Sequence, residues 1–440
     1  RGRVPGVISG GLTGLINGVA GVGGPATVLY LMALPDKPET HRANIVSAMA
    51  FVTISVFAAD HHSVVGFDKN QGVVDALNAG KSHIEGVDSA DLVRHIASGS
   101  FKATTNAEEI ADSDVVVIAV PTPLTKDRKP DLTFVEAACK TIGENLKTPA
   151  LIINESTSFP GTVRNLIKPE IEKYSGGSIE HMYAVSPERV DPGRVDWDQK
   201  NTPRLYAGLT PEASKAVREF YSTFCDNLIE VSSPEVAESA KLFENTFRQV
   251  NNALVNEFAQ IAHALGISVY ETLDAAATKP YGFMKFMPSA GVGGHCIPVD
   301  PSYLADAAAR VGVPATFIER ANEVNLEMAA YVVGRVAADN GGTLSGKSVQ
   351  VIGVAYKPNV ADTRETPAEL VIEELKKAGA VVSWHDPVVK SWHGAESSDL
   401  GGSEIAVVVT MHDVVSADAV LASAPYVFDT TGKVKTSHTL

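Results

Sequence analysis

From residue 62 onward, short apolar runs alternate with longer stretches whose apolar residues recur at helical spacing. Short buried strands that alternate with helices are typical of a doubly wound parallel sheet. A long gap separates the third run from the fourth, so we expect an α/β fold with two Rossmann-like parallel-sheet domains. The runs are rich in Val and Ile and stand at 63–68, 114–120, 150–154, 348–353, 380–384, 406–410 and 426–429.

Between the two groups of runs lies a stretch that predicts a single long helix. Residues 234–265 contain no Gly and no internal Pro, and their apolar residues follow a helical period. Ser232 and Ser233 can cap the helix, and Pro234 is favoured in a first turn. We expect this helix to join the two domains.

The first 58 residues are a different kind of chain. Residues 4–35 and 43–59 carry no charged side chain, and about 20 apolar residues suffice to span a bilayer. The Gly-rich string GLTGLINGVAGVGGPATVLYLMAL resembles a segment of the sulfite-exporter-type membrane permeases. We therefore expect a foreign, membrane-associated segment joined near residues 58–60 to an enzyme that lacks its first strand and glycine turn. The alternative is a buried Gly-rich βα unit of a soluble domain.

Composition narrows the function. The chain has 440 residues, enough for two to four domains, and a net charge of −15, which argues against a nucleic-acid-binding protein. Its three cysteines cannot form a disulfide framework and fit a reducing, cytoplasmic compartment. We expect no metal site.

Ligands of such sheets bind beyond the carboxyl ends of the strands. Asp68 ends the first run, as the ribose-binding acid of a dinucleotide site would. The G-x-G-x-x-G turn that accompanies such an acid is expected about 20 residues upstream, but residues 45–59 contain no glycine. The string at 21–26 fits G-x-G-x-x-A, yet it lies about twice too far from Asp68, so we do not take it as the cofactor turn.

The densest chemical signal is Gly-Val-Gly-Gly-His-Cys at 291–296. Glycines let a substrate lie against the backbone, and an accessible thiol can act as a nucleophile. Cys139 and Cys225 stand in helical patterns, and we interpret them as core packing. Lys241 and Asn245 are four residues apart on the long helix, so both face one side and could hold an oxyanion.

From about residue 59 onward, the chain resembles the UDP-glucose/GDP-mannose dehydrogenase family. The wording of several motifs is most similar to the branch that acts on UDP-N-acetylglucosamine or UDP-N-acetylmannosamine. The strings that carry the resemblance are VVGFDKNQ, IAVPTP, ESTSFPG, SPERVDPG, AESAKLFEN, GGHC and YKPNVADTR.

The resemblance implies NAD-dependent, four-electron oxidation of the C6 alcohol of a UDP-N-acetylhexosamine to the uronic acid, for cell-surface polysaccharide synthesis. Cys296 would form a thiohemiacetal and then a thioester. Lys241 and Asn245 would stabilise oxyanions, Asp300 and Glu188 would assist proton transfer or water activation, and Thr157 would position water. Arg189 and Asp300 could instead be members of structural ion pairs.

The same resemblance implies the binding residues and the assembly. NAD would contact Asp68, Pro121, Thr122, Ser156 and Arg364. The UDP-sugar would contact Arg189, Ser289, Gly293 and Lys357. The long helix would form a homodimer. The expected domains are an apolar segment over 1–58, a truncated NAD-binding domain over 59–205, a central helical domain over 206–330 and a UDP-sugar-binding domain over 331–440.

Two alternatives remain open. The chain could be a UDP-glucose 6-dehydrogenase, or a chimeric chain that no longer binds NAD and only binds a nucleotide sugar. A transport-protein fragment is disfavoured because most of the chain has an α/β pattern.

Overall fold

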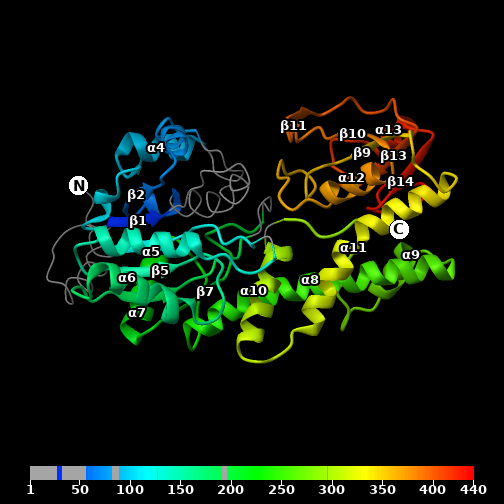
Figure 1. Ribbon diagram of the computed structural model, residues 1–440. Helices are drawn as coiled ribbons and strands as arrows, with labels where there is room; N and C mark the ends of the chain where they lie inside the picture. Colours follow the sequence, from blue (N-terminus) through cyan, green and yellow to red (C-terminus); the bar gives the residue numbers. More distant parts are fainter. Residues whose placement is uncertain (1–26, 32–55, 82–88, 126, 191–195, 295) are drawn as a thin grey trace. The chain divides into compact units, whose positions relative to one another are not determined.

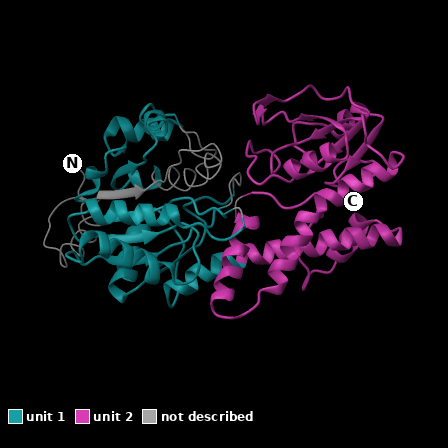
Figure 2. Cartoon of the chain, viewed as in Figure 1, with its two compact units in different colours: residues 1–243 teal, residues 244–440 magenta. Residues whose placement is uncertain are grey.

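The computed structural model describes the backbone of residues 27–31 and 56–440, except residues 82–88, 126, 191–195 and 295 (Figure 1). The chain divides into two compact units, residues 1–243 and residues 244–440 (Figure 2). Each unit is described by itself.

The first unit is built on an eight-stranded sheet with the order β3-β2-β1-β4-β5-β6-β7-β8. Neighbours from β3 to β6 are parallel, and β7 runs antiparallel to β6. The order 3-2-1-4-5-6 is that of dinucleotide-binding domains, and its direction reverses between β1 and β4. The strands are β1 (Thr27–Leu31), β2 (Ser63–Phe67), β3 (Phe101–Thr104), β4 (Val115–Ile118), β5 (Leu151–Asn154), β6 (Met182–Val185), β7 (Arg204–Gly208) and β8 (Leu228–Glu230).

Strand β1 corrects one expectation from the sequence. Thr27–Leu31 pairs in parallel with both β2 and β4, so the sheet has its central strand and the expectation that this strand is missing is wrong. An uncharged run of this kind suits a strand buried on both faces as well as it suits a lipid environment, and the pattern alone does not separate the two. The rest of residues 4–55 lies outside the described residues. Among the described residues, no helix has the length and apolarity to cross a membrane.

Helices cover both faces of this sheet because successive residues of each strand point to opposite sides. Val115 and Val117 of β4 belong to a core shared with α3 (Gln71–Asn78), α4 (Ser89–Ser98) and α7 (Pro211–Tyr221). Val116 and Ile118 belong to a second core, shared with α5 and α6. This doubly wound arrangement confirms the predicted Rossmann architecture. The bounds of these last helices are α5 (Thr133–Asn145) and α6 (Lys168–Ser175), with a π-helical turn at Val163–Ile167.

Helix α8 (Pro234–Leu265) has the predicted bounds, and its first ten residues belong to the first unit. In the second unit it is followed by α9 (Val269–Ala277), α10 (Cys296–Arg310) and α11 (Thr316–Asp339). A four-stranded parallel sheet of order β10-β9-β13-β14 follows and shares one core with α8, α9 and α11. The strands of this sheet are β9 (Ser348–Ile352), β10 (Val381–His385), β13 (Ile405–Val408) and β14 (Tyr426–Asp429). The same part of the chain also forms α12 (Pro367–Lys377), α13 (Ala417–Ser423) and a separate hairpin of β11 (Ser391–Trp392) and β12 (Ala395–Glu396).

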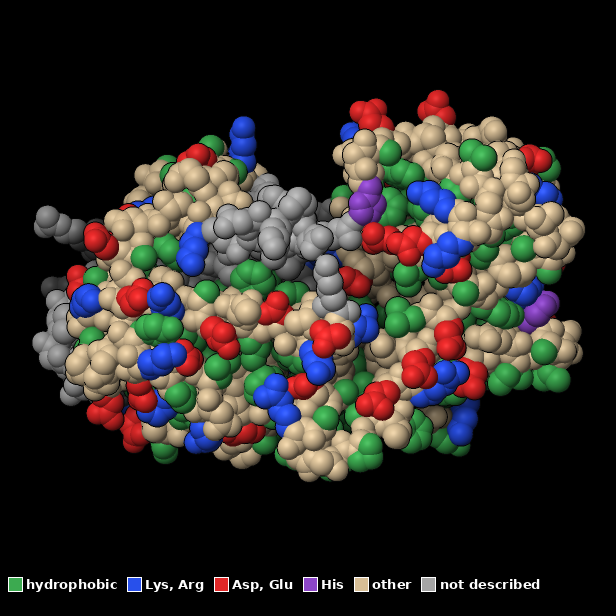
Figure 3. All heavy atoms as spheres, viewed as in Figure 1, with side chains coloured by type: hydrophobic (Ala, Val, Ile, Leu, Met, Phe, Trp, Pro, Cys, Tyr) green, Lys and Arg blue, Asp and Glu red, His purple; other side chains and the backbone are tan. Residues whose placement is uncertain are grey.

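The surface carries both signs of charge. On the face seen in Figure 3, basic side chains are interspersed with acidic ones. The chain as a whole has 52 acidic residues against 37 basic residues. The described residues of this face therefore offer no continuous basic field of the kind that a polyanion would need.

Candidate active site

Asp68 directly follows β2, at the edge of the sheet where the other parallel strands also end. Its side chain is only 3% exposed, and its Oδ1 accepts a hydrogen bond from the Asn70 backbone N–H at 2.7 Å. Burial raises the pKa of Asp68 to about 6, although the Asn70 bond acts in the opposite direction. A carboxylate in this position can accept hydrogen bonds from a ribose.

Three further predicted NAD contacts lie at the ends of β4 and β5. Pro121 and Thr122 follow β4 and are buried. Ser156 follows β5, where its Oγ accepts a hydrogen bond from Val120 N–H at 2.7 Å and lies 3.3 Å from the Ile118 carbonyl oxygen, to which it donates. The structure therefore brings four of the five predicted residues to one edge, beside the point where the strand order reverses.

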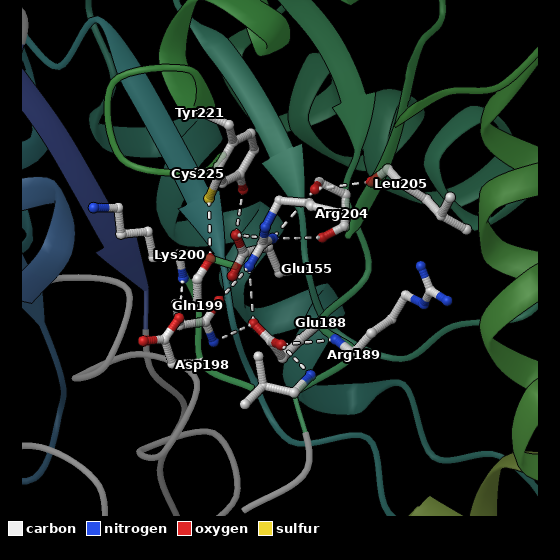
Figure 4. A network of polar contacts seen from close by, with 12 residues as sticks. Glu155, Glu188, Arg189, Asp198, Gln199, Lys200, Arg204, Leu205, Tyr221 and Cys225 are labelled. Atoms are coloured by element: carbon white, nitrogen blue, oxygen red, sulfur yellow. Dashed lines mark hydrogen bonds and ion pairs between the residues drawn. The ribbon is translucent and has the colours of Figure 1, made fainter. Parts of the chain in front are cut away.

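A buried network follows β5 and β6 (Figure 4). Arg204 begins β7 and is 4% exposed, and its Nη1 donates to Glu155 Oε1 at 3.0 Å. Its Nη2 donates to Glu188 Oε2 at 2.9 Å and to Gln199 Oε1 at 2.7 Å. Tyr221 OH donates to the same oxygen of Glu155.

The two carboxyl groups of this network titrate differently. Burial raises the pKa of Glu155 to about 7, although Arg204 acts in the opposite direction. Burial also acts to raise the pKa of Glu188, but Arg204 and the backbone and side-chain donors outweigh it, so that this pKa lies below its ordinary value. Pairs of carboxyl groups with separated pKa values are typical of sites that hold one charge and one proton.

Two residues of α8, Glu238 and Lys241, act on the loops that follow β5 and β6. Lys241 is buried, and its charge acts to lower the pKa of both Glu155 and Glu188. Glu238 accepts hydrogen bonds from Gly161 N–H at 2.6 Å and Val163 N–H at 3.2 Å. Burial raises its pKa to about 8. Glu238 thereby fixes the loop after β5, which carries the buried Thr157.

Glu155, Arg204 and Glu238 were not predicted from the sequence as members of this site. Glu155 and Glu238 stand inside strings that carry the family resemblance, so a signal was present for them. Arg204 stands in a stretch without a motif, and its burial follows from pairing two strands that the pattern did not indicate, β6 and β7.

Arg189 lies beside this network. Its Nη1 donates to the Pro203 carbonyl at 2.9 Å, and its backbone N–H donates to Glu188 at 2.7 Å. It lines a small recess whose other lining residues are Pro187, Glu188, Val190, Gln199, Thr202, Pro203 and Arg204.

In the second unit, Cys296 is the first residue of α10, and its side chain is half-buried. The positive end of the helix dipole stabilises negative charge at this position. Asp300 lies one turn further along α10 and is 0% exposed, and Asn245 Nδ2 donates to its Oδ2 at 2.7 Å. Cys139 and Cys225 are buried, as predicted, and burial raises the pKa of Cys225 to about 11.

The glycines before Cys296 pack tightly against a second loop. A Cβ on Gly293 would lie 2.8 Å from Tyr356 Cβ and 2.8 Å from Pro367 Cδ, so a side chain does not fit there. Gly294 N–H donates to the Arg364 carbonyl at 3.0 Å. The loop that precedes the thiol therefore lies against the loop that carries Lys357 and Arg364.

Ser289 anchors the start of the glycine loop. Its N–H donates to Asn256 Oδ1 at 2.9 Å, and its Oγ donates to the Gly291 carbonyl at 2.7 Å. Asn256 of α8 in turn donates to Asn325 of α11 at 3.0 Å. The two helices thus fix where this loop begins.

Arg364 is buried and pairs with Asp362 through Nε and Nη2. Its Nη1 is also buried, and within the described residues it has no hydrogen-bond partner. A buried guanidinium N–H of this kind is suited to a ligand oxygen.

The half-buried Lys357 belongs to a loop held by the residues after β13 and β10. Asn359 has a φ of 65°, and its N–H donates to His412 Nδ1 at 2.8 Å. Because Nδ1 accepts, His412 Nε2 carries the hydrogen that it donates to Asp386 Oδ2 at 3.0 Å. Burial acts to raise the pKa of Asp386, but the bonds from His412 and from backbone N–H groups outweigh it and lower the pKa to about 2.

Comparison with known families decides the identity of this fold and site. Three successive family descriptions match the chain: the NAD binding domain of the UDP-glucose/GDP-mannose dehydrogenase family at residues 49–225, its central domain at 235–327 and its UDP binding domain at 350–436. The chain belongs to the UDP-glucose/GDP-mannose dehydrogenase family. It is therefore an NAD-dependent oxidoreductase of nucleotide sugars.

Named relatives cover most of the chain. A UDP-N-acetyl-D-mannosamine dehydrogenase of Pyrococcus horikoshii is 34% identical over 367 residues, which are 82% of this chain and 86% of the relative. A UDP-N-acetyl-D-glucosamine 6-dehydrogenase of Pseudomonas aeruginosa is 36% identical over 342 residues, which are 76% and 79% of the two chains.

Solved structures of the family share the fold. The UDP-D-ManNAc dehydrogenase of P. horikoshii has a TM-score of 0.81 at 30% identity and covers 93% of this chain and 97% of that one. The UDP-N-acetyl-mannosamine dehydrogenase Cap5O from Staphylococcus aureus has a TM-score of 0.78 at 30% identity, with coverage of 94% and 96%.

These matches correct the expected junction. The NAD-binding match begins at residue 49, so residues 49–58 belong to the dehydrogenase and not to a permease-like segment. The resemblance of residues 1–58 to a membrane permease is not supported.

Proposed function

We propose that this dehydrogenase oxidises the C6 alcohol of a UDP-N-acetylhexosamine to the carboxylate, as a step toward cell-surface polysaccharide. The observation that carries the proposal is Cys296 at the first turn of α10, with buried Asp300 one turn away and bonded to Asn245. The substrate class rests on the named relatives, which act on UDP-N-acetyl-mannosamine and UDP-N-acetyl-glucosamine. The three free cysteines suit the cytoplasm.

The residues at the edge of the first sheet fit NAD. Asp68 offers a buried acceptor to a ribose, and Pro121, Thr122 and Ser156 stand at the ends of the next two strands. Arg364 offers a buried N–H to the cofactor. When bound, each NAD+ would accept one hydride from C6, so the full oxidation to the carboxylate would use two NAD+ molecules in succession.

The chain's own residues hold the sugar carbon and its oxygen. Cys296 holds the C6 aldehyde as a thiohemiacetal and then the acyl group as a thioester, which water cleaves to the carboxylate and the free thiol. Lys241 and Asn245 stabilise the oxyanions. Asp300 and Glu188 assist proton transfer or water activation, and Thr157 positions the water.

The nucleotide sugar is bound by Lys357, Ser289, Gly293 and Arg189. The lack of a side chain at Gly293 lets the loop before Cys296 lie against Tyr356 and Pro367, which fill the space that a Cβ would need. Lys357 supplies a cation on a loop whose shape is fixed by His412. A fixed cation suits a diphosphate.

The enzyme acts as a homodimer through α8. Leu254 and Phe243 are 63% and 66% exposed, and together with Phe247, Ile261 and Leu265 they form an apolar stripe at spacings of four and seven residues. A second copy of the helix would cover this stripe. Light scattering should give the mass of a dimer, and Leu254→Glu should shift it to the monomer.

A second candidate is a chain that binds the nucleotide sugar but not NAD. No glycine occurs between residues 25 and 65, a range that includes the whole connection from β1 to β2, where the pyrophosphate turn of this fold stands. Without it, the backbone cannot approach the pyrophosphate as closely.

One set of measurements separates these functions. NADH formation is followed with UDP-N-acetylglucosamine, UDP-N-acetylmannosamine and UDP-glucose, and NAD+ and each UDP-sugar are titrated separately by calorimetry. Turnover of an N-acetylhexosamine substrate supports the proposal, and turnover of UDP-glucose alone would replace it with UDP-glucose 6-dehydrogenase activity. Binding of a UDP-sugar without binding of NAD+ would establish the second candidate.

A further inference from the structure

Arg204 is a buried cation that joins two carboxyl groups from different strand ends (Figure 4). It bonds to Glu155, which directly follows β5, and to Glu188, which follows β6. The backbone reinforces this link, since Glu188 N–H donates to the Glu155 carbonyl at 3.4 Å. The guanidinium therefore spans the two loops that carry Thr157 and Glu188.

The guanidinium of Arg204 is itself held from several sides. Its carbon lies 4.5 Å from the centre of the Tyr221 ring, and Nη1 also contacts Ser186 Oγ at 3.2 Å. Gln199 bridges the cluster, because its Oε1 accepts from Arg204 and its Nε2 donates to Glu188 Oε2 at 2.6 Å. A planar guanidinium fixed in this way sets the direction of its partners as well as their distance.

The Glu188 carboxylate has donors on both oxygens. Oε1 accepts from Arg189 N–H at 2.7 Å and from Val190 N–H at 2.6 Å, and Oε2 accepts from Gln199 and Arg204. Arg204 is the only charged group among these donors. It therefore contributes most to keeping Glu188 ionised inside the protein.

Glu155 is the second carboxyl group on Arg204. Within the described residues its Oε2 is buried without a hydrogen-bond partner, while Oε1 takes the bonds from Arg204 and Tyr221. The groups that face it are Arg204 from β7, Glu188 from the loop after β6, Tyr221 from the end of α7, Cys225 from the segment after α7, and Lys241 from α8. Arg204 bonds to both carboxyl groups, whereas Lys241 acts on them only through its charge, and the larger number of hydrogen-bond donors favours Glu188 as the ionised member of the pair.

We propose that Arg204 and Glu155 are positioning residues, which hold the Glu188 carboxylate ionised and oriented while Glu155 takes the proton of the pair. This inference rests on the proposed function of Glu188 in the oxidation. It adds two residues that touch neither the sugar nor the cofactor but fix a group that acts on the water or the proton.

The test uses the full-length chain with Arg204→Gln, Arg204→Lys and Glu155→Gln. Arg204→Gln should lower kcat by about 10- to 100-fold, the usual effect of losing a residue that orients a functional group, and leave the KM for the UDP-sugar within about threefold. Arg204→Lys keeps the positive charge but not the planar set of N–H donors, so its kcat should lie between those of the parent and Arg204→Gln. Glu155→Gln should remove an ionisation near pH 7 from the profile of kcat. Arg164→Gln, which breaks a surface pair with Glu235, is the matched control and should change neither quantity.

A double-mutant cycle gives a second test that does not depend on turnover. It compares the thermal-unfolding midpoints of the parent, Arg204→Gln, Glu188→Gln and the double variant. Non-additive midpoints are expected if Arg204 holds Glu188. Additive midpoints, or unchanged kcat and an unchanged pH profile in Arg204→Gln, would overturn the inference. An inactive parent chain would instead refute the proposed function, and in that case the cycle alone decides whether Arg204 holds Glu188.

Discussion

The side-chain amide of Asn245 donates to the Asp300 carboxylate at 2.7 Å and thereby ties α8 to the first turns of α10. Asp300 is fully buried, and it lies four residues after Cys296 on the same helix. Side chains at this spacing share one face of a helix. The amide, the carboxylate and the thiol are therefore parts of one local arrangement.

Asp300→Asn should stall the reaction after the thioester has formed. If Asp300 assists the water that cleaves the acyl group, its loss removes general acid–base assistance and lowers kcat by about 100-fold. Intact-mass spectrometry should then detect the acyl group on Cys296. Asp306→Asn changes a half-buried residue of the same helix that pairs with Arg310, and as the control it should keep full turnover. Slow turnover without acyl-enzyme would assign Asp300 to an earlier step.

The affinity for NAD+ should depend on pH through Asp68. Its folded-state pKa is raised to about 6, and only the ionised carboxylate is a full acceptor for the ribose hydroxyls. Affinity is therefore highest above pH 7 and should fall about tenfold as the pH is lowered to 5. Calorimetric titrations at several pH values measure this. Asp68→Asn should bind weakly at every pH, and an equally steep pH dependence in that variant would contradict the assignment.

Stability should fall with rising pH through Glu238. Its folded pKa of about 8 exceeds the ordinary value of 4.5, so between these values the folded state holds a proton that the unfolded state has lost. The contribution is fully present below pH 4.5 and is lost as the pH rises toward 8. The melting midpoint of Glu238→Gln should therefore decline less over this range, by about 5 °C. Glu235→Gln, one turn earlier on α8 and with a lowered pKa, should not reproduce this change.

Helices and strands could be predicted where neighbouring residues alone determine the pattern of apolar positions and caps. The long helix over 234–265 was predicted with its observed ends, because a capping serine, an N-terminal proline and an uninterrupted period all agree there. Strands β4 and β5 were found because both faces of each are apolar. For β1 the same uniform apolarity misled, since an apolar strand and a membrane segment have similar compositions over five residues.

The parts of the site that the sequence did not reveal depend on long-range pairing. Arg204 meets Glu155 across 49 residues of chain, and only the folded sheet brings them together. Cys296 was found because the glycine-rich segment that precedes it is a local pattern. A buried arginine without a motif leaves no such signal.

The loop that carries Lys357 offers the last prediction. Asn359 bonds to both His412 and Asp413, and the side chains of Asn359 and Asp413 pair at 2.7 Å. His412 in turn bonds to Asp386, so the loops after β9, β10 and β13 are held together at the carboxyl edge of the second sheet. Because this edge is where a parallel sheet binds its ligand, His412→Ala should raise the KM for the UDP-sugar by about tenfold and change kcat little.

His438→Ala is the matched control for this variant. His438 also pairs with an aspartate, Asp339, but it is partly exposed and lies at the end of the chain. Its loss should leave the KM for the UDP-sugar unchanged. The prediction would be wrong if His412→Ala lowered kcat at constant KM, or if calorimetry gave the parent affinity for the UDP-sugar. Either result would show that UDP-sugar binding by Lys357 does not depend on the hydrogen bonds of His412. The expected split, in which binding weakens while the chemical step at Cys296 continues, would assign the second sheet to substrate binding and α10 to the reaction.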